Sequence, residues 1–313
     1  MTDKIAFVFP GQGSQYVGMG KDLADTYVVA RDTFAEADDS LGFALSAMCF
    51  EGPKEDLNDT FNTQPATLAT SVAVLRVLEA EGWAVAPAFV AGHSMGEYSA
   101  LVAAGALAFG DALRLVRERG RLTKVAGERS PGGMAAVLKL DAQKLDEICM
   151  QASRETGGDV QVANYNSPGQ IVISGNDAAL GRAMELAKEA GARRARKLAV
   201  SAAFHSPLMM PIVNEFQQAV EAAPINVAKV PIVSNVTARP ITSVKEVQDE
   251  LVLQLTSSVR WIESVEWMAQ QGVSKTVEMG PKEVVTGLVQ RIDASVSAVA
   301  CGTVESIQSL LAS

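Results

Sequence analysis

The residues best suited to chemistry in this chain are one serine and two histidines. Ser94 lies in the sequence Gly-His-Ser-Met-Gly at residues 92–96. That sequence matches the G-x-S-x-G turn, which presents a nucleophilic serine between a strand and a helix. A serine hydroxyl needs a base to accept its proton at neutral pH, and a neutral imidazole is the most frequent one. The 313-residue chain has only two histidines, His93 and His205, so the choice of base lies between them.

His205 is the better candidate of the two. In a turn of this kind the serine lies at the apex, and the residue before it points elsewhere. Pro207 cannot extend a strand ladder and so indicates a loop after the extended segment 197–200. Loops at strand ends often carry catalytic groups. A chance match to a short glycine motif is the alternative, but residues 88–91 are typical of a buried strand and residues 97–104 of a helix, as the motif requires.

The composition favours a soluble cytoplasmic protein with a large core. Apolar residues make up 48% of the chain, and no apolar stretch approaches the roughly 20 residues of a membrane span. Cys49, Cys149 and Cys301 lack metal-site spacing and are typical of a reducing compartment. No secretion signal is evident at the start. A net charge of -9 argues against a general nucleic-acid binder, although it leaves room for a local basic patch.

Alternating helices and buried strands predict an α/β protein. Strands are expected at residues 4–9, 231–235 and 274–279, and helices dominate residues 21–81. The glycine-rich loop at 10–15 lacks the third glycine of a dinucleotide fingerprint and the Gly-Lys-Ser/Thr of a P-loop. We interpret this loop as a source of exposed backbone N–H groups.

Residues 131–199 have a pattern of their own. Strands are expected at 134–138, 160–163, 170–174 and 193–199, and helices at 141–152 and 176–190, with a turn at 166–169. The order βαββαβ is that of a ferredoxin-like unit. Because Ser94 precedes it and His205 follows it, we expect a subdomain (131–199) inserted into a larger domain (1–130 and 200–313), with the active site in the cleft between them.

Arg119 lies on the apolar face of the helix expected at residues 111–127. At about 100° per residue it falls inside a stripe of alanine, leucine and valine. Burying an unpaired charge is costly, so the guanidinium needs an anion. The anion could be a core carboxylate in a salt bridge, or a substrate carboxylate held bidentately. A second stripe predicts a solvated face that could also meet an acidic partner: Arg114, Arg117, Arg121 and Lys124.

Together these segments resemble the malonyl-CoA:acyl carrier protein transacylases and the related acyltransferase domains of fatty-acid and polyketide synthases. The resemblance covers nearly the whole chain. It rests on Phe-Val-Phe-Pro-Gly-Gln-Gly-Ser-Gln (7–15), Asn-Thr-Gln-Pro-Ala (62–66), Gly-His-Ser-Met-Gly-Glu-Tyr (92–98), Arg-Gly (119–120), Asn-Ser-Pro-Gly-Gln (166–170), Phe-His-Ser (204–206) and Glu-Met-Gly-Pro (278–281). It implies an α/β-hydrolase-like large domain with an inserted ferredoxin-like subdomain.

The resemblance also implies roles for individual residues. Ser94 would be the acylated nucleophile, His205 its base and Arg119 the ligand of the free carboxylate. The backbone N–H groups of Gln12 and Met95 would form the oxyanion hole. Gln254 would orient His205 through its main-chain carbonyl.

The implied reaction is ping-pong transfer of malonyl from malonyl-CoA to the phosphopantetheine thiol of an acyl carrier protein. No metal or redox cofactor is implied, and we expect a monomer that binds neither nucleic acid nor membrane. Residues 202–205 are Ala-Ala-Phe-His, whereas related malonyl-selective polyketide domains often carry His-Ala-Phe-His; the retained Phe204 favours malonyl over methylmalonyl only weakly. Met95 stands where leucine is common. For Gln64 and Asn164 we slightly favour ordinary packing or turn bonding, and the sequon at Asn235 is interpreted as accidental.

Three alternatives stay open. A serine hydrolase would use the same turn with water as acceptor, and Asp111, Asp141 or Asp159 could supply its acid. A malonyltransferase of a malonate decarboxylase would carry similar motifs. A non-catalytic carrier-docking module would keep Ser94 and His205 apart. Arg119 discriminates best against an esterase, because a neutral acyl chain gives the guanidinium no partner.

Overall fold

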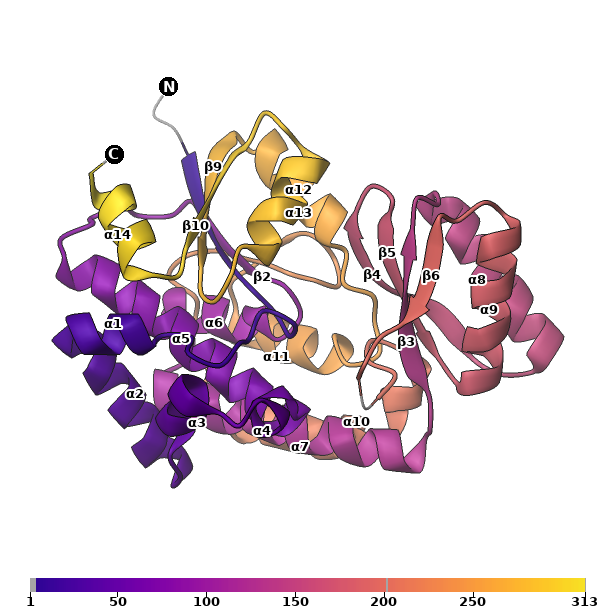
Figure 1. Ribbon diagram of the computed structural model, residues 1–313, viewed down its shortest axis with the longest axis horizontal. Helices are drawn as coiled ribbons and strands as arrows, with labels where there is room; N and C mark the ends of the chain where they lie inside the picture. Colours follow the sequence, from indigo (N-terminus) through magenta and orange to yellow (C-terminus); the bar gives the residue numbers. More distant parts are fainter. Residues whose placement is uncertain (1–3, 201, 313) are drawn as a thin grey trace.

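The computed structural model describes residues 4–200 and 202–312 and contains a six-stranded and a four-stranded sheet (Figure 1). In the large sheet the strands are ordered β10-β9-β1-β2-β7-β8, and all neighbours are parallel except β7 and β8. Its strands are β1 (Lys4–Phe9), β2 (Phe89–Gly92), β7 (Ile232–Val233), β8 (Pro240–Ile241), β9 (Val273–Met279) and β10 (Ser297–Cys301).

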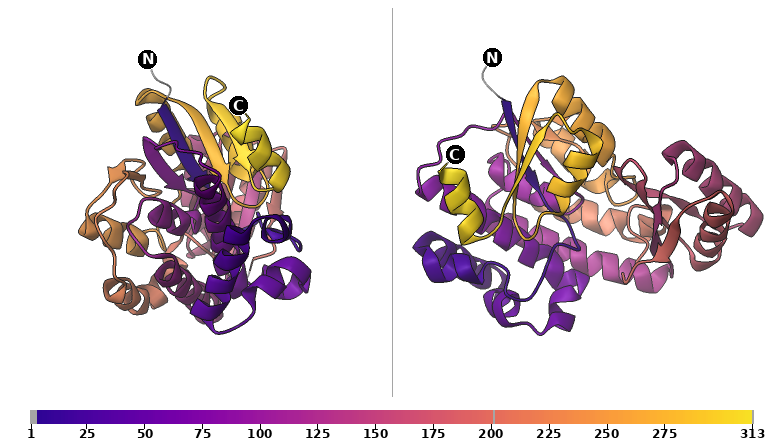
Figure 2. Two further views of the ribbon diagram at one scale, coloured as in Figure 1. Left: turned by 90° about the vertical axis from the view of Figure 1, so that its left-hand side faces the viewer. Right: turned by 45° about the horizontal axis from the view of Figure 1, so that its top comes forward.

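Helices cover both faces of the large sheet (Figures 1 and 2). The helices outside residues 133–197 are α1 (Lys21–Thr26), α2 (Val28–Leu41), α3 (Leu45–Glu51), α4 (Lys54–Asn58), α5 (Thr60–Ala80), α6 (Gly96–Ala103), α7 (Phe109–Arg129), α10 (Met210–Ala222) after the 3-10 turn η1 (Pro207–Met209), α11 (Val244–Leu253), α12 (Trp261–Gln270), α13 (Val284–Ile292) and α14 (Val304–Leu311).

Strand β1 shows how the sequence produces this layering. Side chains alternate between the two faces of a strand, so Phe7 and Phe9 join the core around α5 while Ala6 and Val8 join a second core around α12 and α13. A central parallel strand is buried on both faces and therefore reads as a continuous apolar run. The expected strand at 4–9 is confirmed.

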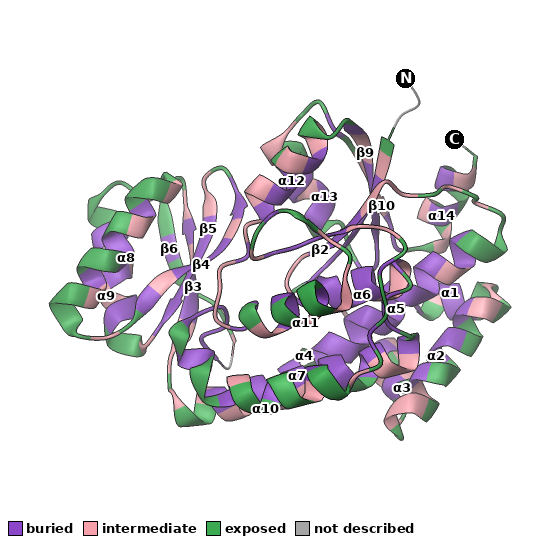
Figure 3. Cartoon of the chain, turned by 180° about the vertical axis from the view of Figure 1, so that it is seen from behind, coloured by how far each residue is buried: buried purple, intermediate pink, exposed green. Residues whose placement is uncertain are grey.

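The small sheet contains β3 (Gly133–Leu138), β4 (Val160–Ser167), β5 (Gln170–Gly175) and β6 (Arg194–Lys197), in the order β4-β5-β3-β6 with every pair antiparallel. Helices α8 (Ala142–Thr156) and α9 (Asp177–Glu189) cover its face directed away from the large sheet (Figures 1 and 2). Their apolar stripes pack inward and their opposite faces are exposed (Figure 3). The expected βαββαβ order is confirmed.

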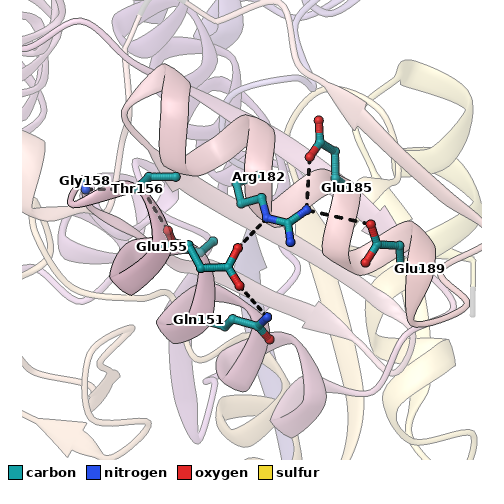
Figure 4. Close-up of polar contacts among 8 residues, drawn as sticks. Gln151, Glu155, Thr156, Gly158, Arg182, Glu185 and Glu189 are labelled. Carbon is teal, nitrogen blue, oxygen red and sulfur yellow. Dashed lines mark hydrogen bonds and ion pairs between the residues drawn. The ribbon is translucent and has the colours of Figure 1, made fainter.

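Arg182 on α9 links the two outer helices. It contacts Glu155 on α8 and both Glu185 and Glu189 on its own helix (Figure 4). Exposed pairs of this kind contribute little to stability. Their consequence is that this arginine's charge is already balanced by three carboxylates.

The small sheet is joined to the rest of the chain along strand β4. The Val259 N–H donates to the Ala163 carbonyl at 2.8 Å, and the Tyr165 N–H donates to the Val259 carbonyl at 2.9 Å. The Ser258 hydroxyl also donates to the Val162 carbonyl, at 2.6 Å. The segment just after α11 therefore continues the ladder of the small sheet.

Some expected boundaries differ from the structure. The strand expected at 231–235 is reduced to Ile232–Val233, because the next backbone N–H groups bond elsewhere: Ser234 to the Arg239 carbonyl and Asn235 to the Glu97 carboxyl. The helix expected from residue 141 begins one residue later, since Asp141 is its N-cap and accepts from the Lys144 N–H. No helix in the described part of the chain is long and apolar enough to cross a bilayer.

Candidate active site

Ser94 lies at the tight turn between β2 and α6. Its φ of 53° is in the left-handed region, which is rare for residues other than glycine. The turn also needs its two glycines. A Cβ on Gly92 would lie 1.9 Å from the Gly96 carbonyl carbon, and one on Gly96 would lie 2.5 Å from the Phe9 carbonyl oxygen. The strand–turn–helix expected around the serine is confirmed.

Asn235 holds this turn in shape. Its side-chain oxygen accepts from the Ser94 N–H at 2.7 Å, and its amide nitrogen donates to the Gly92 carbonyl at 2.7 Å and to the Glu97 carboxyl at 2.8 Å. Asn235 is fully buried. The sequon at this position is therefore inaccessible, in agreement with its interpretation as accidental.

His205 is in hydrogen-bond contact with the serine. Its Nε2 lies 2.8 Å from Ser94 Oγ, and its Nδ1 lies 2.8 Å from the Gln254 main-chain oxygen. A carbonyl oxygen can only accept, so Nδ1 carries the proton and Nε2 is left to accept the serine proton. Burial, with the nearby positive charge of Arg119 as a second cause, lowers the pKa of His205 to about 3. The ring is therefore neutral at physiological pH, as a general base must be.

The small sheet contributes to the position of His205. Gln161 on β4 donates through Nε2 to the His205 carbonyl at 2.7 Å and to the Thr256 carbonyl at 3.1 Å. His205 itself has a φ of 55°, so its backbone is held in a conformation that needs support. Gln161 ties this strained residue to the segment that follows Gln254.

His93 is directed away from the serine. Its Nε2 donates to the Asn166 side-chain oxygen on β4 at 2.7 Å, and its ring lies near Trp261. Burial lowers the pKa of His93. This geometry supports the choice of His205 over His93 as the base.

Arg119 reaches the serine from helix α7. Only 2% of its surface is exposed, as its position in the apolar stripe predicts. Its Nη1 donates to Gln64 Oε1 at 2.9 Å, and its Nη2 donates to Gln254 Oε1 at 2.9 Å and to Ser94 Oγ at 3.3 Å. Within residues 4–200 and 202–312 no carboxylate pairs with it, so a core salt bridge does not explain its burial.

The two remaining candidate residues, Gln12 and Met95, lie on neighbouring segments. The loop after β1 packs against the serine turn so closely that a Cβ on Gly11 would lie 2.5 Å from the His93 carbonyl oxygen. Met95 immediately precedes α6, so its N–H belongs to the group without partners inside the helix. The Gln12 side chain donates to Thr60 Oγ1 at 3.2 Å.

Several polar residues at the site were not predicted. Gln64, for which packing was slightly favoured, accepts from Arg119; Glu97, Asn235 and Gln161 were not singled out for a role. The cationic stripe also differs in part. Arg114 and Lys124 are exposed and Arg121 is half-buried, and all three pair with acids, whereas the Arg117 guanidinium packs over the rings of Phe43 and Phe61.

Comparison with known proteins identifies the class. The acyl transferase domain family matches residues 6–304, and a serine in contact with a neutral histidine is the equipment such chemistry requires. The protein is thus an acyltransferase.

Close relatives narrow the class. The malonyl CoA-acyl carrier protein transacylase of Bacillus subtilis (strain 168) is 46% identical over 305 residues, covering 97% of this chain and 95% of the relative. That of Escherichia coli (strain K12) is 47% identical over 291 residues, covering 92% and 93%. The chain belongs to the malonyl CoA-acyl carrier protein transacylase family.

Solved structures agree. The crystal structure of an acyl carrier protein S-malonyltransferase from Vibrio cholerae superposes with a TM-score of 0.95 at 46% identity, covering 98% of this chain and all (100%) of that chain. A malonyl-transacylase in complex with a type II PKS acyl-carrier protein also gives a TM-score of 0.95, at 43% identity and 99% coverage of both chains.

Proposed function

We propose that this protein transfers malonyl from malonyl-CoA to the phosphopantetheine thiol of an acyl carrier protein through a malonyl-Ser94 intermediate. The observation that carries the proposal is the position of Arg119, a buried cation 3.3 Å from Ser94 Oγ with neutral partners only among the described residues. In a malonyl ester three bonds separate Oγ from the carboxylate carbon, a span of about 4 Å. A guanidinium beside Oγ is therefore within reach of that carboxylate.

In the first half-reaction Ser94 Oγ attacks the thioester carbonyl and His205 Nε2 accepts its proton. The N–H groups of Gln12 and Met95 stabilise the oxyanion, and each such donor is typically worth about 3 kcal/mol. The intermediate collapses, the carbon–sulfur bond breaks, and CoA takes the proton from His205 and leaves as a thiol. In the second half the carrier's thiol gives its proton to His205 and attacks the ester carbonyl; the bond between that carbon and Ser94 Oγ then breaks, and Ser94 Oγ takes the proton back from His205.

Gln254 and His205 form the part of the site that favours this reading over a serine hydrolase. The group that orients His205 is a main-chain carbonyl at 2.8 Å rather than a carboxylate. Of the acids considered for a hydrolase, Asp111 pairs with Arg114 and Asp141 caps α8. Contact between Ser94 and His205 also argues against a docking module without catalysis.

We further propose that residues 131–199 form a ferredoxin-like subdomain inserted into an α/β-hydrolase-like domain built from 1–130 and 200–313. The antiparallel order β4-β5-β3-β6 supports the first description and the parallel sheet beneath the serine turn supports the second. The protein is proposed to act as a cytoplasmic monomer whose only required partners are malonyl-CoA and the carrier.

The carrier is expected to be acidic, and the edge strand β6 offers it the most available positive charge. Arg193, Arg194 and Arg196 are exposed there without an ion pair in the described part of the chain, while Lys197 pairs with Asp177. The other candidate patch is less suitable because Arg114, Arg121 and Lys124 already contact carboxylates.

The test is intact-protein mass after brief exposure to malonyl-CoA and, separately, acetyl-CoA, followed by addition of holo acyl carrier protein. We expect a malonyl-sized adduct that Ser94→Ala abolishes, that His205→Ala slows by about 10²–10⁴-fold, and that the carrier removes with gain of the same mass. His93→Ala should be less damaging than His205→Ala. An adduct on another residue, or its loss to water at the same rate without carrier, would refute the proposal. If a partner complex converts the malonyl-carrier to acetyl-carrier and carbon dioxide, this would instead indicate the malonyltransferase of a malonate decarboxylase.

A further inference from the structure

Glu97 lies one helical turn after Ser94 and is buried, with 1% of its surface exposed. The mechanism above makes no use of it. One carboxyl oxygen accepts from the Asn235 backbone N–H at 2.7 Å and from the Asn235 amide at 2.8 Å. The other accepts from the Gln254 side-chain amide. Glu97 therefore touches both the residue that shapes the serine turn and the residue that contacts Arg119.

The Gln254 amide has two ends of nearly the same shape, and only its surroundings decide which end faces Arg119. Its Nε2 lies between two acceptors, the Glu97 carboxyl and the Ser94 carbonyl at 3.1 Å. Its Oε1 is thereby turned to the Arg119 guanidinium, which has only donors to offer. A reversed amide would oppose Nε2 to the guanidinium and leave Arg119 without this acceptor.

We propose that Glu97 is a positioning residue for malonyl selection, which fixes the Gln254 amide so that its oxygen holds the Arg119 guanidinium beside Ser94. The inference rests on the proposed function, because it concerns the same acyl pocket. Burial raises the pKa of Glu97, with the neighbouring carboxyl of Glu250 as a second cause.

The substitution Glu97→Gln tests this directly. Asn235 presents two donors to one oxygen at position 97, so the new side chain keeps its oxygen there and turns its NH₂ toward Gln254. Two amide donors then oppose each other and Gln254 is driven to reverse. The hydrogen bond from the charged Arg119 guanidinium to Gln254 Oε1 is then lost. We therefore expect the malonyl-to-acetyl ratio of Ser94 acylation rates to fall by about 10- to 100-fold. The acetyl rate should change far less.

Glu278→Gln is the matched control. It makes the same chemical change in another buried carboxyl, whose own partners are the Val285 N–H at 3.0 Å and the Thr286 N–H at 2.6 Å. Because the Glu278 side chain makes no hydrogen bond to Glu97, Gln254 or Arg119 among the described residues, its variant should keep the wild-type ratio. An equal fall of the ratio in both variants would overturn the proposal in favour of general disruption.

Gln254→Leu supplies the second measurement and remains informative if Glu97→Gln does not fold. It removes the amide and keeps the main-chain carbonyl that orients His205. We expect the ratio to fall in Gln254→Leu, and Glu97→Gln to cause no further fall in that background. An unchanged ratio in Gln254→Leu, or an additive loss in the double variant, would contradict the proposal. Wild-type protein that forms no malonyl adduct would overturn both this inference and the proposed function, whereas acylated wild type with an unchanged ratio in Glu97→Gln would overturn the inference alone.

Discussion

Replacing Arg119 by alanine should change which acyl group the enzyme accepts. Arg119 is 2% exposed and its guanidinium lies 3.3 Å from Ser94 Oγ, so bulk solvent screens its charge little. Malonyl carries a carboxylate that can use this charge, and acetyl does not. We therefore expect Arg119→Ala to depress malonyl transfer and to leave acetyl transfer nearly unchanged or raised.

The magnitude follows from the burial of the pair. Truncating one side of a buried, hydrogen-bonded charge pair typically costs about 2–5 kcal/mol. Converted at about 1.4 kcal/mol per factor of ten, this predicts a loss of roughly 30- to several-thousand-fold in the malonyl-to-acetyl ratio. Arg119→Lys should recover little, because an ammonium keeps the charge but lacks the planar fork.

Folding stability must be measured beside activity. The substitution leaves the side-chain oxygens of Gln64 and Gln254 buried without this donor, at about 1–3 kcal/mol each. Relief from burying the guanidinium offsets part of that cost. The assay is rapid-quench mass spectrometry of Ser94 acylation by the two thioesters, on protein whose thermal midpoint is known. An unchanged malonyl-to-acetyl ratio in folded Arg119→Ala protein would refute the proposal that Arg119 binds the malonyl carboxylate.

Three further predictions concern other parts of the molecule. Because the pKa of His205 is lowered to about 3, the rate of Ser94 acetylation should not fall as the pH drops through 6.5, and a fall there in rapid-quench measurements would contradict this. The contribution of the neutral ring to folding stability should be complete above about pH 6.5 and lost as the pH falls toward 3. Since Ser94 has a φ of 53°, Ser94→Gly should be about 1 kcal/mol more stable than Ser94→Ala in urea unfolding, and equal stabilities would argue against backbone strain. Replacing Arg194 and Arg196 by glutamine should slow transfer to the carrier and reduce the salt dependence of that transfer without slowing self-acylation. The control is Arg182→Gln, which should leave both rates unchanged because the charge of Arg182 is already balanced by carboxylates.

Much of the fold could be predicted because its signals are local. Short-range periodicity and turn residues predict strand β1, the serine turn and the βαββαβ order. The order of strands in either sheet is a matter of tertiary pairing and has no such local signal. The early end of β7 shows the same limit, because the Asn235 N–H donates to the buried carboxyl of Glu97, 138 residues away in the sequence.

Candidate site residues could be predicted where the residue type is rare in the chain or where a charged residue lies on an apolar helix face. His205 stands out because histidine is scarce, and Arg119 because a cation interrupts an apolar stripe. Gln64 and Glu97 carried no such signal, as a polar residue in a helix is usually exposed. Their importance lies in contacts with residues 55 and 157 positions away, which spacing alone does not reveal.

The two edges of the small sheet differ in how they avoid pairing with another molecule. Strand β4 is capped by the chain's own segment at Val259, so its outer backbone groups are partly used. Among the residues that the structure describes, strand β6 pairs with β3 alone and presents arginines and a lysine instead, a common protection against edge-to-edge aggregation. We expect the charges proposed to receive the carrier also to oppose edge-to-edge association of this strand. Variants that neutralise this edge should be checked by light scattering, because association of the variant would also slow transfer and could be mistaken for weaker docking.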